Sequence, residues 1–129
     1  MGRSATSKAF APSAVLSGVL LGLGFAVACA LLIGFILTLA PWDSLPSWIG
    51  VFHLLSAAVG GAWAAQRCQR FGWIHGGAVG LIYVLVVSAA FVKGFQTAHL
   101  ASPDWLAQAG WTFLAGAVGG ALGVNVRGS

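Results

Sequence analysis

Six polar side chains in the 129-residue sequence lie within long apolar runs, where they could handle a proton, an ion or a polar solute: Ser17, His53, Ser56, His75, Tyr83 and Ser88. A histidine can exchange a proton near neutral pH, and hydroxyls can line a path for a small solute. Neither histidine has an acidic residue in these runs to pair with. The commoner roles are therefore a histidine bound to a backbone carbonyl and hydroxyls bonded between helices. Both alternatives stay open, and the six residues form a candidate polar path.

Groups that usually carry catalysis are not recognisable in the sequence. It contains no phosphate-binding glycine loop, no zinc-protease helix, and no nucleophile with histidine and acid partners. Cys29 and Cys68 fit no zinc pattern, so we expect no metal and no cofactor. A charge at the centre of a bilayer costs about 2.5–3.5 kcal/mol, and one kept there usually has a function. The apolar runs contain none, which argues against a proton-driven carrier. We expect a protein that is not an enzyme.

Small residues four positions apart recur in the apolar runs and indicate how helices could pack. This spacing puts glycines on one helix face and lets two backbones approach closely, which favours association in lipid. We expect helix packing at Gly18, Gly22, Gly60, Gly61, Gly76, Gly80, Gly116, Gly119 and Gly120. The alternative is that a surplus glycine face joins two copies of the chain.

The elements that carry these residues are long apolar segments. The chain is 59% hydrophobic and 6% charged, with a mean hydropathy of +0.94, whereas soluble domains carry about 25% charged residues. At roughly 20 apolar residues per span, the length fits an all-α integral membrane four-helix bundle. The expected spans are 12–40, 47–65, 73–92 and 105–126. They form one domain, 12–126, between a cytoplasmic tail, 1–11, and a cytoplasmic end, 127–129.

The basic residues predict the orientation of these spans. Six Lys and Arg face two Asp and Glu, for a net charge of +4, and they stand singly at the ends of apolar runs. We therefore expect no nucleic-acid partner. Four spans place both ends and the linker 66–72 on one side, which then holds all of the basic residues except Lys93. The positive-inside rule predicts that both termini are cytoplasmic, with Arg67, Arg70 and Arg127 as topology anchors.

The two halves of the chain resemble each other. The segment AVGGA occurs at 58–62 and again at 117–121, and Gly18 and Gly22 match Gly76 and Gly80. Two helices per unit give both units the same orientation, so we expect a parallel repeat about a pseudo-twofold axis along the membrane normal. The glycine faces of spans 1 and 3 are then expected to lie against each other near that axis. Chance similarity between glycine-rich helices is the alternative.

Two segments carry a resemblance to a known family. The run GWIHGGAVGLIYVLV at 72–86, followed by GAVGGALGVNVR at 116–127, resembles the YrzE-like family of small four-span bacterial membrane proteins, common in Firmicutes. The most specific parts are the GW-x-HG entry to span 3 and GG-x-x-GVN near the C-terminus. The resemblance implies a four-span fold in a bacterial inner membrane. It implies no activity and no catalytic residue.

Two functions fit these observations. The first is an accessory or packing protein of the lipid bilayer, which associates with itself as a homo-oligomer or with another membrane protein through its glycine-rich faces. The alternative is an oligomeric pore or small-solute permease, with a path lined by serine, tyrosine and glycine backbone. An enzyme ranks last.

Overall fold

The computed structural model describes residues 11–39, 48–68, 70–91 and 102–127. They form four α-helices: α1 (Pro12–Leu39), α2 (Trp48–Cys68), α3 (Gly72–Phe91) and α5 (Pro103–Arg127). The prediction of an all-α chain with four helices is confirmed. Most of the expected N-terminal tail, the connections after α1 and α3, and residues 128–129 lie outside the described residues, as do Arg3, Lys8 and Lys93.

Three helices are long and apolar enough to cross a membrane, over Pro12–Leu39, Gly72–Ala90 and Pro103–Val126. Among the described residues, α2 is not one of these. The polar residues His53, Gln66 and Arg67 lower its hydropathy. Helix α2 contacts each of the other three helices, and small residues such as Gly60, Gly61 and Ala64 suit a helix whose neighbours are other backbones rather than lipid tails.

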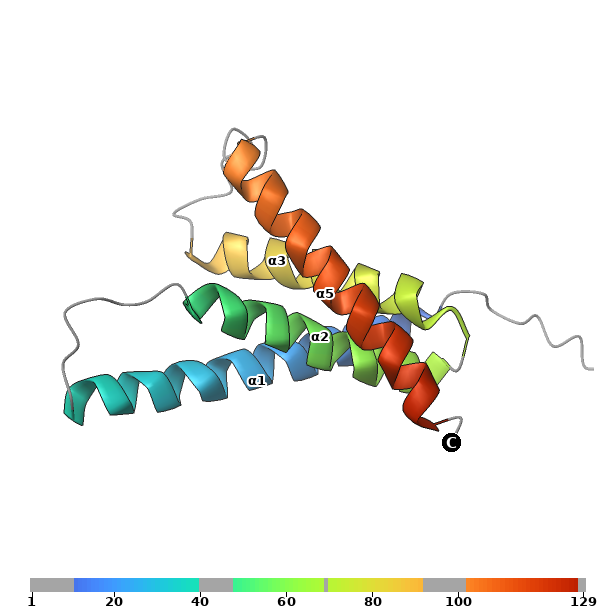
Figure 1. Ribbon diagram of the computed structural model, residues 1–129, viewed down its shortest axis with the longest axis horizontal. Helices are drawn as coiled ribbons and strands as arrows, with labels where there is room; N and C mark the ends of the chain where they lie inside the picture. The colour runs from blue at the N-terminus through green and yellow to red at the C-terminus, as the bar shows by residue number, and fades with distance from the viewer. Residues whose placement is uncertain (1–10, 40–47, 69, 92–101, 128–129) are drawn as a thin grey trace, which may run out of the picture.

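The helices run alternately up and down (Figure 1). The N-terminal ends of α1 and α3 lie at the same end of the bundle as the C-terminal ends of α2 and α5 (Figure 1). Helix α5 crosses α2 and α3 obliquely and packs against both. Within the described part of the chain, α1 contacts α2 and α3 but not α5. The bundle therefore consists of two helix hairpins, α1–α2 and α3–α5, joined mainly through α2.

Helix α1 has a packed half and an open half. Its buried residues, Ala14, Val15, Gly18, Val19 and Gly22, all lie in the first half. The second half carries large apolar side chains that contact little protein, with Leu31 and Leu39 each 71% exposed. Side chains of this kind suit a surface that faces hydrocarbon.

The connection between α2 and α3 is shorter than the expected linker 66–72, because α2 continues to Cys68 and α3 begins at Gly72. Gln and Arg are good helix formers, so the polar residues at 66 and 67 extend the helix instead of ending it. Phe71 turns the chain with a positive φ of 51°. Its carbonyl accepts the amide hydrogens of Ile74 and His75 at 3.0 and 3.2 Å. The other helix bounds differ from the expected spans by at most one residue, apart from the start of α5, which lies two residues earlier at Pro103, a favoured residue for a first helical turn.

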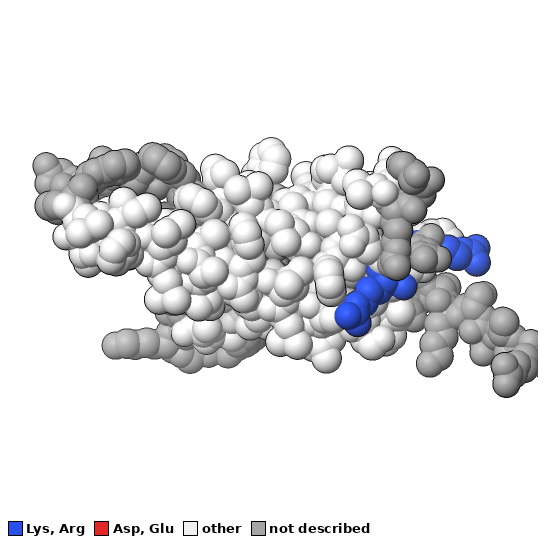
Figure 2. Space-filling model, turned by 90° about the horizontal axis from the view of Figure 1, so that it is seen from below, with Lys and Arg blue, Asp and Glu red and all other residues white. Residues whose placement is uncertain are grey.

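The basic side chains of the described residues gather at one end of the bundle (Figure 2). Arg67 and Arg70 lie at the junction of α2 and α3, and Arg127 ends α5, whereas Asp104 lies in the first turn of α5 at the opposite end. The Arg67 guanidinium is 5.3 Å from the centre of the Trp63 ring. Such a pair keeps the arginine stem on apolar surface while its charge reaches the polar interface.

The position of Cys68 makes the orientation testable. It is the last residue of α2, beyond the expected span 47–65 and next to Arg67. In a Cys29→Ala variant, a membrane-impermeant maleimide should modify Cys68 in opened cells or inverted vesicles and leave it unmodified in intact cells. Burial raises the pKa of the Cys68 thiol, so labelling is best run at mildly alkaline pH, where more of the reactive thiolate is present.

Modification of Cys68 in intact cells would reverse the orientation argued here. Replacing Arg67 and Arg70 together with glutamine should give a mixed population, because positive charge at this end of the bundle sets the preference. Replacing the exposed Gln108 with asparagine is a matched change without charge and should leave the labelling pattern unaltered.

Candidate functional site

The α1–α2 hairpin is closed by a row of small residues, here called the first glycine row: Ala14, Gly18 and Gly22 on α1, and Ser56, Gly60 and Ala64 on α2. A Cβ added to Gly18 would lie 2.5 Å from the Gly60 carbonyl oxygen and 2.9 Å from the Ala64 Cβ. One added to Gly22 would lie 2.9 Å from the Ser56 carbonyl oxygen. Real Cβ atoms essentially never come this close, so the two backbones touch and no larger side chain fits.

The α3–α5 hairpin repeats this arrangement in the second glycine row: Gly72, Gly76 and Gly80 on α3, and Thr112, Gly116 and Gly120 on α5. Gly72 lies against the Gly120 carbonyl oxygen, Gly76 against that of Gly116, and Gly80 against that of Thr112. In both rows, steps of four residues along one helix meet steps of four along an antiparallel partner. The two hairpins therefore close by the same contact.

A third close contact joins the two hairpins. Gly61 lies against the Gly116 backbone, and Gly119 against the Ala58 carbonyl oxygen. With Gly61 and Gly119 included, each of the nine glycines that the sequence predicts at helix contacts lies against a neighbouring helix. Sequence reasoning missed Gly72, Gly77 and Gly123, each of which also faces a neighbouring helix. The signal was available for Gly72 and Gly123, which continue the four-residue spacing of Gly76 and Gly119.

The expectation that the glycine faces of spans 1 and 3 lie against each other is wrong. The α1 glycines face α2 and the α3 glycines face α5. The physical reason is that consecutive antiparallel helices use their glycine faces to close each hairpin. The other faces of α2 and α5 then make the contact between the two hairpins.

The contacts of the two hairpins do not follow the register that the AVGGA match suggests. In α2, Gly60 faces α1 and Gly61 faces α5. In α5, Gly119 faces α2 and Gly120 faces α3. Matching the two AVGGA segments therefore equates glycines with exchanged roles. The contacts instead align Ser56-xxx-Gly60-xxx-Ala64 with Thr112-xxx-Gly116-xxx-Gly120, three residues away.

Three residues of the candidate polar path lie together between α2 and α3. His53 Nδ1 and the Tyr83 hydroxyl are hydrogen-bonded at 2.8 Å, and Tyr83 is only 1% exposed. Ser56, fully buried one turn along α2, donates its hydroxyl hydrogen to the Phe52 carbonyl at 2.7 Å. The bond between His53 and Tyr83 links α2 to α3.

The other three residues of the candidate polar path lie elsewhere. Ser88 accepts a hydrogen bond from Trp105 Nε1 at 2.8 Å, which links α3 to α5. Ser17 donates to the Ala14 carbonyl of its own helix at 2.9 Å. His75 is buried, with Nδ1 3.0 Å from the Phe71 carbonyl oxygen and Nε2 accepting the Ala11 amide hydrogen at 3.2 Å. Its bond to a backbone carbonyl is the commoner role expected for a histidine without an acidic partner.

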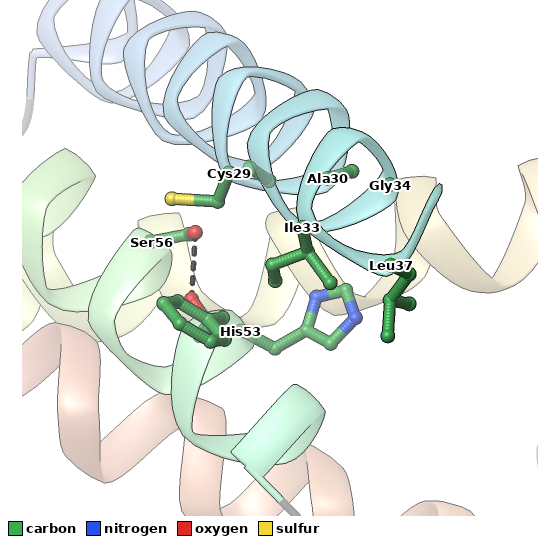
Figure 3. A pocket seen from close by; sticks show the side chains of 9 residues that line it. Cys29, Ala30, Ile33, Gly34, Leu37, His53 and Ser56 are labelled. Atoms are coloured by element: carbon green, nitrogen blue, oxygen red, sulfur yellow. Dashed lines mark hydrogen bonds between the residues drawn. The ribbon is translucent and has the colours of Figure 1, made fainter. Parts of the chain in front are cut away.

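A groove of about 270 Å³ lies between the second half of α1 and the first turns of α2. Figure 3 shows the His53 ring reaching toward Ile33 and Leu37 of α1, with Cys29 and Ser56 farther along the groove. The lining is apolar except for the His53 ring, the Ser56 hydroxyl and the Cys29 thiol. The sequence held a signal for it, because Ala26, Ala30 and Gly34 continue the spacing of the first glycine row. The start of this row, at Gly18 and Gly22, packs against α2, whereas its continuation at Ala26, Ala30 and Gly34 lines the groove.

Comparison with known proteins identifies a family. Residues 11–123 match a family described as "Protein of unknown function (DUF3792)". The chain belongs to this DUF3792 family. The matched region of the DUF3792 protein includes both glycine rows, the His53–Tyr83 pair and the groove. No curated protein and no solved structure matches the chain.

The separate glycine rows predict additive losses of stability. Gly22→Leu and Gly80→Leu should each lower the free energy of unfolding in detergent by about 1–3 kcal/mol, because each forces two backbones apart. The rows share no contact at these positions, so the losses should add in the double variant. Gly24→Leu is the matched control, since an added Cβ there meets nothing within 4 Å. Clear non-additivity would restore a shared seam between α1 and α3.

The His53–Tyr83 bond predicts coupling between two substitutions. His53→Leu leaves the buried Tyr83 hydroxyl without this partner and should destabilise the protein by about 1–3 kcal/mol. Tyr83→Phe should cost less, because half-buried His53 can still reach the groove. The double variant removes both polar groups and should cost less than the sum of the single changes. Denaturant titration in detergent measures all three, and strict additivity would mean that the bond contributes nothing.

Proposed function

We propose that this DUF3792 protein is a non-catalytic accessory protein of a membrane, which acts by associating with itself or with another membrane protein. The observation that carries the proposal is the open half of α1. Its large apolar side chains, Leu31, Leu32, Phe35, Ile36 and Leu39, are exposed. The glycine faces, in contrast, are used within the chain. Association through side chains of α1 is thus favoured over association through a surplus glycine face.

We further propose that all four helices cross the bilayer with both termini in the cytoplasm. The position of α2 among three neighbours supports its membrane crossing despite its lower hydropathy. Arg67 and Arg127 belong to the C-terminal ends of α2 and α5, which lie at the same end of the bundle, and Arg70 follows α2; this supports the orientation. A bacterial inner membrane and the finer YrzE-like assignment belong to the same proposal, supported by the segments at 72–86 and 116–127.

An internal repeat is a related proposal. The equivalence of the two glycine rows, down to the hydroxyl residues Ser56 and Thr112 at the same step, supports it. Both hydroxyls donate to a carbonyl one turn back in their own helix. The symmetry of such a repeat is incomplete, because α3 contacts α2 whereas α1 and α5 make no equivalent contact among the described residues.

A pore or small-solute permease is the second candidate. The observation in its favour is the His53–Tyr83–Ser56 cluster beside the groove. Flux distinguishes the two candidates, because purified protein in liposomes conducts ions or small solutes only if it forms a path.

Cross-linking tests the proposed association. In a background without native cysteines, Phe35→Cys on the open half of α1 should form adducts heavier than the monomer when membranes are oxidised. Leu122→Cys is the control, since Leu122 is similarly exposed but lies on α5. Mass determination of the adducts separates a second copy from another protein. Monomer alone at Phe35→Cys, together with solute flux in liposomes, would reject the accessory role in favour of the pore.

A further inference from the structure

The groove beside His53 opens toward the surroundings of the bundle, not into its core. One wall is the second half of α1, where Leu32, Phe35 and Ile36 are exposed around the lining residues. In a bilayer such a surface meets lipid tails. At about 30 Å³ per small group, a volume of about 270 Å³ accommodates part of one hydrocarbon chain, and the apolar lining suits one.

The second hairpin differs from the first at the level of the groove. There the corresponding region of α3 and α5 is tied by the hydrogen bond from Trp105 Nε1 to Ser88. Ser88 is equivalent to Ala30 in the register of the glycine rows. Ala26, Ala30 and Gly34 offer almost no side chain to fill the space beside α2, and an added Cβ at Gly34 meets nothing within 4 Å. The space is thus built by small residues.

His53 gives this apolar groove one hydrogen-bonding group. The Ser56 hydroxyl, which also bonds Tyr83, uses its hydrogen on the Phe52 carbonyl. Either tautomer of His53 fits the bond to Tyr83, and we take the one in which the Tyr83 hydroxyl donates to Nδ1. A neutral imidazole then carries its own hydrogen on Nε2. The His53 ring reaches toward Leu37, close to the end of α1 (Figure 3). The donor is thus presented to whatever occupies the groove.

The depth of His53 narrows the chemistry of the occupant. His53 lies five residues after the start of α2, about 7.5 Å along the helix axis, and helical side chains lean back toward the N-terminus. With the start of α2 placed at the membrane surface, Nε2 lies within about one to two helical turns of the headgroups, near the level where the fatty chains of a lipid begin. The lining contains no Lys or Arg to bind a phosphate. A neutral oxygen acceptor fits this position.

We propose that this groove is a lipid-binding site that holds one acyl chain of a glycerolipid, with its ester carbonyl accepting a hydrogen bond from Nε2 of His53. The site rests on the membrane location proposed above but not on the accessory role. Phe52 and Ile33 contact the chain, and Tyr83 positions the imidazole from behind.

Lipid retention by the full chain in mild detergent tests the site. The probes are dioleoyl phosphatidylcholine and its diether analogue, which lacks both ester carbonyls, offered at equal amounts and counted by native mass spectrometry. The wild-type protein should retain the ester lipid about fivefold over the ether, as expected for one neutral hydrogen bond. His53→Leu combined with Tyr83→Phe should abolish the preference without leaving a buried hydroxyl unpaired. Tyr83→Phe alone keeps the Nε2 donor and should keep the preference for the ester lipid.

Substitutions that fill the groove with a large side chain provide a second test of the lipid-binding site. Ala30→Phe and Gly34→Phe should each abolish retention of both lipids, whereas Gly24→Phe, on the same helix at a position with open space around it, should not. Equal retention of ester and ether lipid by the wild type, or unchanged retention in both filled variants, would overturn the site. Preferential retention of a prenyl quinone over the ester lipid would overturn the assigned occupant.

Failure of this site and failure of the membrane location give different results. If the protein is recovered with the membrane fraction but retains no lipid in the groove, only the lipid-binding site is rejected. If it is recovered outside that fraction, the membrane location is rejected, and the proposed function with it.

Discussion

Direct contact between helix backbones is the constraint on which this structure depends. In lipid there is no hydrophobic force between helices, so stability must come from close packing and from polar bonds between them. Both hairpins meet this requirement in the same way, with carbonyl oxygens of one helix lying where the side chains of the other would be. The large aliphatic residues are thereby displaced to the outside. This distribution reverses that of a soluble bundle, in which large apolar residues fill the core.

The same constraint explains the character of α2. A helix with close neighbours on three sides needs small residues on three faces, and α2 accordingly contains the Gly60–Gly61 pair and several alanines. Its lower hydropathy comes from His53, Gln66 and Arg67 and not from these small residues. Two of the polar residues that α2 carries, His53 and Ser56, find partners on α3 or on α2 itself.

Much of this arrangement could be predicted from the sequence. Apolar length predicts the four helices, and the four-residue spacing of small residues points to the faces that meet. What the sequence could not supply is the choice of partner for each face. Gly60 and Gly61 are adjacent in the chain but point to different helices, and the AVGGA match hides this exchange. For the groove, the spacing of Ala26, Ala30 and Gly34 marks a face of small residues, but only the path of α1 in space shows that this part of the face is uncovered.

The bond from the Ala11 amide to His75 has a consequence for the order in which the molecule is completed. Ala11 begins α1, its carbonyl accepting the amide hydrogens of Ala14 and Val15, and Pro12 has no amide hydrogen of its own. The acceptor for the Ala11 amide comes from a residue 64 positions later in the chain. During synthesis, the amide of Ala11 therefore gains this acceptor only after the start of the third helix has been made.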